Sequence, residues 1–258
     1  MSNFKHSFWR YCVDPDAFSG VSRVRDFVKI LKKQSNTPEA AKPYHDLGRF
    51  SHYDEDDMPA ILAPRYFGAG GEALCEAWLE TFGAIRNVSG YQSQDTGYIS
   101  KEDTGYDGFG RTLYSKNYKY KVSGLCKPCR PNDPVYLQIK TALNPMKEFS
   151  TNDGSRIMNF YGNANGLAKL DGKSSTARFI LVTTGKGLHH KLNQNTQGEI
   201  EVINFKDLSK SADGNDIFWT LVHKRLGIPV PVFKVEPDPE FVIAQEELAD
   251  DTVDTEEI

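Results

Sequence analysis

The sequence predicts an α/β protein in which a helix, three strands, a second helix and a fourth strand follow one another. Apolar residues recur at three- and four-residue intervals over 72–82 and 155–169, which is typical of helices with one buried face. Short apolar runs between turn residues instead indicate buried strands. The expected strands cover residues 86–91, 107–122, 134–140 and 178–184.

Further elements are expected on both sides of this core. Residues 21–31 carry a helical stripe of apolar side chains, and 199–205 form a weaker strand. A last helix, 215–226, is expected to end before GIPVPVF, because proline disrupts a helix interior. A chain of 258 residues suffices for one hydrophobic core with a small appendage. The expected parts are an N-terminal helical and loop extension (1–66), a main domain (67–235) and an acidic tail (236–258).

The charge of the chain is distributed unevenly. The net charge is −4, yet residues 236–258 hold ten acidic residues and no Lys or Arg. Residues 1–235 therefore carry 31 basic against 25 acidic residues, a net charge of +6 that suits an anionic partner such as DNA. The tail either only keeps the chain soluble or competes for the basic surface when nucleic acid is absent.

Several classes of protein are excluded by composition. No apolar run approaches the ~20 residues that cross a bilayer, and the first residues lack the features of a secretory signal, so we expect no membrane partner and a cytoplasmic location. Four cysteines do not make a disulfide framework in a chain of this length. Cys126 and Cys129 form a CxxC pair, but Cys12 and Cys75 stand alone, so we expect a thiol pair rather than a four-ligand zinc site.

Two glycine-containing segments resemble nucleotide-binding loops only loosely. Residues 68–73 precede a helix as a dinucleotide loop does, but the APRYF before them is not a buried strand. In residues 166–174, five residues separate the glycines where the phosphate cradle needs four, and the segment leads into a strand. We therefore expect these segments to bind neither a dinucleotide nor a hydrolysable nucleotide.

The residues that point to chemistry lie on two of the expected strands. Gln138 and Lys140 are two positions apart, so both project from the same face of strand 134–140. Burying a lysine is costly without an anionic partner, which a phosphodiester or a carboxylate–metal cluster would provide. The alternative is that Lys140 lies at the strand end and reaches water. Asp107, beside Gly108, places a carboxylate at the start of the preceding strand.

This combination suits phosphodiester hydrolysis, which needs a divalent cation, an activated water and a positive group near the developing charge. Asp107, the Gln138 side-chain oxygen and the Ile139 carbonyl are hard ligands suited to Mg²⁺. Lys140 can orient or deprotonate the water and offset negative charge in the transition state. A second acid is expected on the preceding helix, and the candidates are Glu72 and, one turn later, Glu76.

Four segments in order resemble the Mrr-type branch of the PD-(D/E)xK nucleases, in which a glutamine replaces the usual acid to give D…QxK. They are GEALCEAWLETFG, GYDGFG, VYLQIK and RFILVTTGKG, and they cover roughly residues 67–192. The resemblance implies a restriction-endonuclease-like core of a helix, a three-stranded meander, a helix and a strand, with Glu72 as the helix acid and Asp107 as the metal ligand. It also implies an endonuclease that hydrolyses DNA with Mg²⁺, or with Mn²⁺ in its place, in a prokaryotic or phage-infected cell.

The nuclease-like region, 67–235, departs from this pattern through a basic insertion at 111–133. Basic residues neutralise phosphates and tyrosines stack on bases, so we expect this insertion to follow the DNA backbone. The alternative is an exposed hairpin with ordinary charges. Three tyrosines are interleaved with its six cations, which are Arg111, Lys116, Lys119, Lys121, Lys127 and Arg130.

The sequence is compatible with more than one mode of action and with more than one class of function. A nuclease with one site per chain is expected to cut both strands as a homodimer, or to act with a partner helicase. A different class of function is a nuclease fold that has lost catalysis and holds DNA or a protein.

Overall fold

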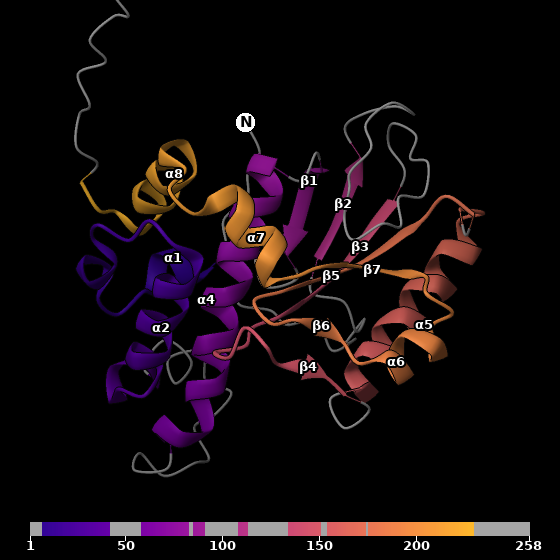
Figure 1. The fold of residues 1–258 in the computed structure, drawn as a ribbon, viewed down its shortest axis with the longest axis horizontal. Coiled ribbons are helices and arrows are strands. Elements are labelled where there is room, and N and C mark those ends of the chain that lie inside the picture. The colour runs from indigo at the N-terminus through magenta and orange to yellow at the C-terminus, as the bar shows by residue number, and fades with distance from the viewer. Residues whose placement is uncertain are drawn as a thin grey trace, which may run out of the picture. The chain divides into compact units, whose positions relative to one another are not determined.

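The structure is a computed structural model and describes residues 7–41, 58–82, 85–90, 108–112, 134–150, 154–173 and 175–229. In this part of the chain, helices lie on both sides of a mixed five-stranded sheet with the strand order β1-β2-β3-β5-β7 (Figure 1). The predicted α/β class is confirmed. None of the helices described is long and apolar enough to pass through a bilayer.

The sheet combines an antiparallel half with a parallel half. Strands β1 (Ile85–Gly90), β2 (Gly108–Thr112) and β3 (Pro134–Lys140) form an antiparallel meander. Strands β5 (Arg178–Thr183) and β7 (Ile200–Ile203) run parallel to β3. Parallel neighbours need a crossover connection, and helix α5 supplies it between β3 and β5. The predicted strand 134–140 is confirmed in full.

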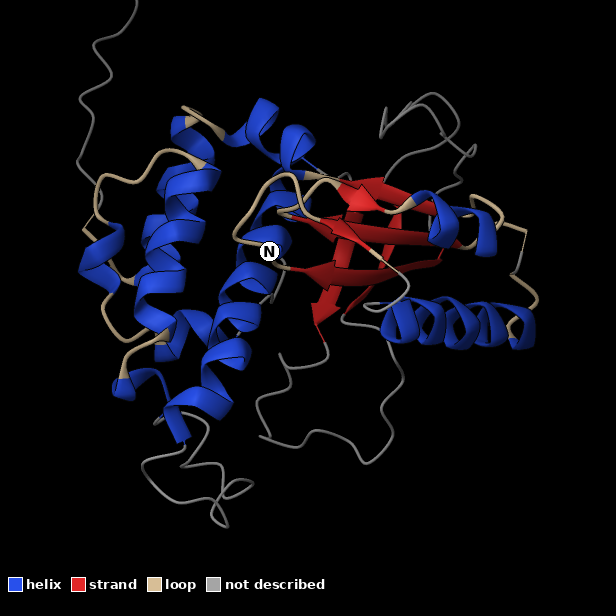
Figure 2. Ribbon diagram, turned by 60° about the horizontal axis from the view of Figure 1, so that its bottom comes forward, coloured by secondary structure: helices blue, strands red, loops and turns tan. Residues whose placement is uncertain are grey.

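One face of the sheet carries most of the helices, which Figure 2 shows on one side of the strands. Apolar side chains from these helices form a single hydrophobic cluster with residues of β3, β5 and β7. Its buried members include Phe27, Leu74 and Phe218. The helices are α1 (Ser7–Tyr11), α2 (Val24–Ser35), α4 (Met58–Phe82), α7 (Phe205–Ala212) and α8 (Asp216–Leu226).

The opposite face is covered by α5 (Gly154–Leu170) and α6 (His190–Asn195), which belong to a second hydrophobic cluster. Ile157 and Phe160 of α5 are fully buried there, as the sequence predicts. A small parallel sheet, β4 (Glu148–Phe149) with β6 (Gly187–Leu188), adds to this side.

Helix α4 begins fourteen residues earlier than residues 72–82 predict, and the boundary expected between 66 and 67 falls inside it. Glycines normally weaken a helix interior, which is why the pattern alone stops short of them. Here close packing explains them: a Cβ on Gly70 would lie 2.3 Å from Leu31 Cδ1 and 2.9 Å from Phe8 Cε2. The N-terminal helices therefore pack directly on the α4 backbone and are part of the main hydrophobic cluster.

A buried polar network also ties the N-terminal region to α4. The Tyr66 hydroxyl donates to Gln34 Oε1 at 2.9 Å and accepts from the Val13 amide at 3.2 Å. Gln34 Nε2 donates to the Asp14 carbonyl at 2.7 Å, within a segment that continues into the short helix η1 (Pro15–Phe18). Burial raises the pKa of the adjoining Cys12 thiol to about 11, so this cysteine is an unreactive part of the core.

Helix α2 starts three residues after the predicted position 21. Its first residue, Val24, donates its amide to Asp213 Oδ1 at 2.8 Å, while Arg23 at the N-cap makes no side-chain capping bond. The Gly214 amide also donates to the Ser22 carbonyl at 2.8 Å. The start of α2 is thus set by Asp213, in the turn between α7 and α8. Its carboxylate accepts a hydrogen bond from a helix amide that has no partner within the helix.

Candidate functional site

Strand β3 presents two chemically different faces. Val135, Leu137 and Ile139 belong to the cluster around α4, whereas Tyr136 belongs to the cluster around α5. Side chains alternate along a strand, so Gln138 and Lys140 share the Tyr136 face. The predicted common face for these two residues therefore agrees with the structure.

The two residues differ in exposure, in a way that suits different roles. Gln138 is 3% exposed, whereas Lys140, the last residue of β3, is half-buried. A buried amide must satisfy its hydrogen bonds inside the protein or through a bound ligand. A half-buried lysine at a strand end can present its ammonium to a molecule that approaches from solvent.

Two threonines at the end of β5 fix the chain as it leaves β3. The Thr183 hydroxyl donates to the Lys140 carbonyl at 2.6 Å, and the Thr184 amide reaches the same oxygen at 3.4 Å. The Thr184 hydroxyl accepts from the Ala142 amide and donates to its carbonyl, both at 2.8 Å. The paired threonines of the RFILVTTGKG segment thus hold the backbone on both sides of residue 141.

These bonds also give a direction to the Ile139 carbonyl. Successive carbonyls of a strand point to opposite sides, and that of Lys140 is directed at β5. The Ile139 carbonyl is therefore directed at the β2 side. The first described residue of β2, Gly108, lies opposite Leu137, two positions before Ile139.

Helix α4 closely approaches the end of β3. An ideal Cβ on Gly71 would lie 1.8 Å from Thr141 Oγ1, so only a glycine lets the helix pass this close. Glu72 is the next residue of the helix, as Thr141 is the next residue after Lys140. The structure thus brings together the segments that carry Glu72 and Lys140.

The two candidate acids on α4 have different surroundings. Glu72 is half-buried, whereas Glu76, the alternative one turn later, is only 2% exposed. Cys75 beside them is fully buried, and its thiol pKa is raised by burial and then by the negative charges of Glu76 and Glu72. Cys75 is thus a core residue, and of the two acids Glu72 is the more accessible.

We predict that Gly71→Ala lowers the free energy of unfolding by about 1–3 kcal/mol, because the added methyl group overpacks against Thr141. Gly68→Ala is the matched control, since it lies in the same helix and its Cβ would meet nothing within 4 Å. We expect that control to gain roughly 0.5–1 kcal/mol from helix propensity. Urea unfolding measures both changes, and a Gly71→Ala protein as stable as Gly68→Ala would contradict the close approach.

Most of the predicted residues of the preceding strand and of the basic insertion lie outside the described part of the chain. Asp107 lies outside the described residues, one position before β2. Arg111 lies in β2, opposite Arg86 of β1 and Pro134 of β3. The insertion is expected to begin at residue 111, but β2 continues to Thr112, so the first residues of the expected insertion belong to a strand. The remaining predicted residues of the insertion lie outside the described part of the chain: Lys116, Lys119, Lys121, Cys126, Lys127, Cys129 and Arg130.

The oxygen donors that can be placed fit a hard divalent cation in part. Gln138 and the Ile139 carbonyl supply neutral oxygens, and Mg²⁺ sites normally add at least one carboxylate. Among the described residues, no group of three or more His, Cys, Asp and Glu side chains could hold a metal ion. A complete site would therefore need a carboxylate from elsewhere, for which the sequence predicts Asp107 and Glu72; Glu72 is the residue after Gly71, whose backbone lies against Thr141.

The two segments that loosely resemble nucleotide-binding loops are mostly helical in the structure. Residues 68–73 lie inside α4 and follow no strand, and residues 166–170 form the last turns of α5 rather than a loop. Thr141 is the contact residue that the sequence pattern does not indicate. Its contact with α4 is revealed only by Gly71, the helix residue that lies against it.

Comparisons of the chain with protein-family models, with curated proteins and with solved structures found no match.

Proposed function

We propose that this protein is a Mg²⁺-dependent endonuclease that hydrolyses DNA phosphodiester bonds and has a restriction-endonuclease-like core. The order of elements supports the proposal. Helix α4, the meander β1-β2-β3, helix α5 and the parallel strand β5 follow one another as the resemblance to the Mrr-type nucleases implies.

The observation that carries the proposal is the placement of Gln138 and Lys140. They share one face at the carboxyl end of β3, with the amide buried and the lysine half-buried. The described part of β2 begins opposite Leu137, the neighbour of Gln138, and Asp107 is the residue before that strand. Gln138 and Lys140 therefore lie at the end of β3 that adjoins the described start of β2, and Asp107 comes directly before that start in the sequence.

Each residue has a distinct task in the proposed reaction. Asp107, Gln138 and the Ile139 carbonyl would hold Mg²⁺, which when bound polarises the phosphate and acidifies water. Lys140 orients or deprotonates the attacking water and offsets the charge that develops on the phosphate. Glu72 adds a second carboxylate from α4. The hydrogen bonds from Thr183 and Thr184 hold the Lys140 backbone in place throughout.

The proposal is tested by incubating the purified protein with supercoiled plasmid. We expect conversion to open-circular or linear DNA in Mg²⁺ or Mn²⁺, and none when EDTA removes the metal, because the cation is proposed to polarise the phosphate and acidify the attacking water. Gel analysis over time gives the rate. Binding of plasmid without any cleavage in Mg²⁺ or Mn²⁺ would replace this proposal with the binding-module alternative.

A further inference from the structure

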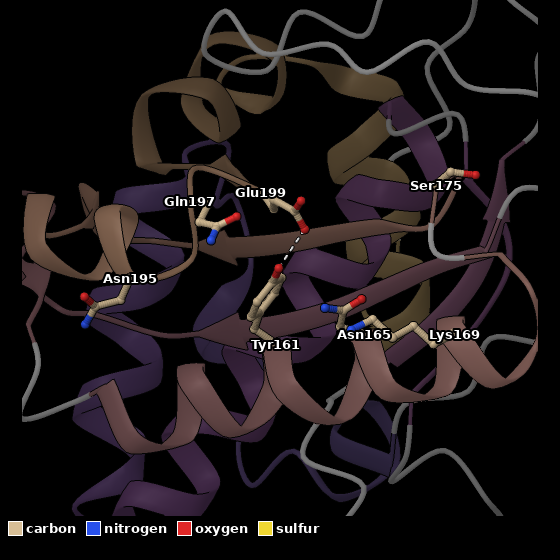
Figure 3. Close-up of a pocket in the computed structure, with 7 residues that line it drawn as sticks. All are labelled: Tyr161, Asn165, Lys169, Ser175, Asn195, Gln197 and Glu199. Atoms are coloured by element: carbon tan, nitrogen blue, oxygen red, sulfur yellow. Dashed lines mark hydrogen bonds between the residues drawn. The ribbon is translucent and has the colours of Figure 1, made fainter.

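A polar groove lies at the end of the sheet opposite to Lys140. It has a volume of about 480 Å³ and opens between α5 and the segments that lead into β5 and β7 (Figure 3). Strands β3, β5 and β7 are parallel, so their amino ends, where this groove lies, are remote from the carboxyl end of β3. The lining residues are Tyr161, Asn165, Lys169, Ser175, Asn195, Gln197 and Glu199.

A hydrogen-bonded pair fixes a carboxylate in the middle of the groove. The Tyr161 hydroxyl donates to Glu199 Oε2 at 2.7 Å, and the Tyr161 ring packs edge-on against Phe179 at 5.3 Å between centroids. Burial and the contact with Glu199 raise the pKa of Tyr161 to about 12, so the phenol remains a donor at neutral pH. A carboxylate accepts hydrogen bonds through both oxygens, so Glu199 can accept from a ligand as well.

The backbone at Gln197 is a second signal. Among the described residues it is the one non-glycine with a positive φ, 54°, and it directly follows Thr196, the C-cap of α6. Glycine is the usual residue at this position because it adopts the left-handed conformation without cost. A glutamine there sacrifices stability, which is expected where its side chain serves a ligand.

The composition of the groove restricts what it can bind. All seven lining side chains can form hydrogen bonds, so a ligand gains from polar contacts rather than from burial of apolar area. In Figure 3, Gln197 and Asn195 lie on one side of the Tyr161–Glu199 pair. On the other side lie Asn165, with the Lys169 nitrogen beside it, and then Ser175.

These three zones match the three parts of a ribonucleotide. An ammonium pairs with phosphate, a carboxylate accepts bonds from ribose hydroxyls, and carboxamides bond in bidentate fashion to base edges. We propose that this groove binds a ribonucleoside monophosphate, with its phosphate at Lys169, its ribose at Glu199 and its base at Gln197 and Asn195. The proposal does not depend on the nuclease activity.

The test is calorimetric titration of the full chain with AMP, GMP, CMP and UMP. We expect saturable binding of at least one of them. The matching nucleoside and the 2′-deoxynucleotide should each bind about tenfold more weakly, since each lacks one charge-assisted contact. Failure of all four nucleotides to bind at millimolar concentration overturns the proposal.

Matched variants assign the three zones. Lys169→Met should remove the difference between nucleotide and nucleoside, and Glu199→Ala the difference between the ribo and deoxy forms. Gln197→Gly should raise the melting temperature while weakening nucleotide binding, because it relieves the left-handed backbone and deletes the base contact. Variants that change the melting temperature but bind the nucleotide as tightly as the natural chain would show that these residues only support the fold, and would overturn the proposal.

Discussion

Replacing Lys140 with methionine is expected to slow plasmid cleavage by about 10²–10⁴-fold, the range associated with loss of a general base or of a charge-stabilising group. Methionine keeps the unbranched stem of the side chain and removes the ammonium. Because Lys140 is half-buried at the end of β3, the fold should tolerate the change. The initial rate of loss of supercoiled plasmid in Mg²⁺ measures the effect.

Lys210→Met is the matched control for this experiment. Lys210 is exposed in the last turn of α7 and lies outside the candidate site, so its loss should leave the rate unchanged. If the Lys140→Met protein cleaves as fast as the control, the assignment of the site to the end of β3 is wrong. Equal loss in both variants would instead indicate a general requirement for positive charge.

Glu201→Ala is expected to lower the free energy of unfolding by about 3–5 kcal/mol, the largest stability effect that the described residues suggest. Glu201 on β7 accepts two hydrogen bonds from Arg178 on β5, one of them from Nε at 2.8 Å and the other from Nη2. The two residues are 4% and 5% exposed. Truncating the glutamate therefore leaves a guanidinium in the interior without its carboxylate.

The double variant Arg178→Met, Glu201→Leu shows how much of the lost stability comes from leaving one charge buried alone. It removes both charges, whereas Glu201→Ala removes only one. Apolar side chains of similar volume commonly replace a buried ion pair at little cost, so we expect most of the stability to return. Guanidinium unfolding followed by circular dichroism compares the three proteins. A single Glu201→Ala variant that unfolds at the same denaturant concentration as the natural chain would show that solvent reaches Arg178 in solution.

The strands of the sheet were predictable because each is marked by a local sequence pattern, a short apolar run between turn residues. The run PVYLQIK is apolar between turn residues, and it forms β3 over the predicted range. Residues 178–184 and 199–205 correspond to β5 and β7, with small differences at their ends. The parallel pairing of β7 with β5 is set by long-range packing, which no local pattern contains.

Helix α4 shows where local rules fail. Pro64, Gly68, Gly70 and Gly71 are all helix-weakening residues, and a sequence pattern accordingly begins the helix after them. Two of these glycines are required by contacts with Leu31 and Thr141, residues that lie far away in the sequence. Tertiary packing compensates for poor propensity, so the start of the helix could not be read from its own residues.

The candidate site was predictable only where strand periodicity applies. The shared face of Gln138 and Lys140 follows from their spacing and agrees with the structure. The proximity of α4 to the end of β3 depends on Gly71 and Thr141, which carry no chemical signal of their own. The convergence of Asp107 with Lys140 stays a prediction, because Asp107 lies outside the described residues.

The hydrogen bond from Val24 to Asp213 has a consequence for how the chain matures. The acceptor follows the donor by 189 positions, so during synthesis the ribosome releases the first turn of α2 long before its cap exists. Until Asp213 has been synthesised, the Val24 amide lacks this acceptor and the first turn of α2 frays. Completion of α2 is therefore a late event in folding, despite the early place of this helix in the sequence.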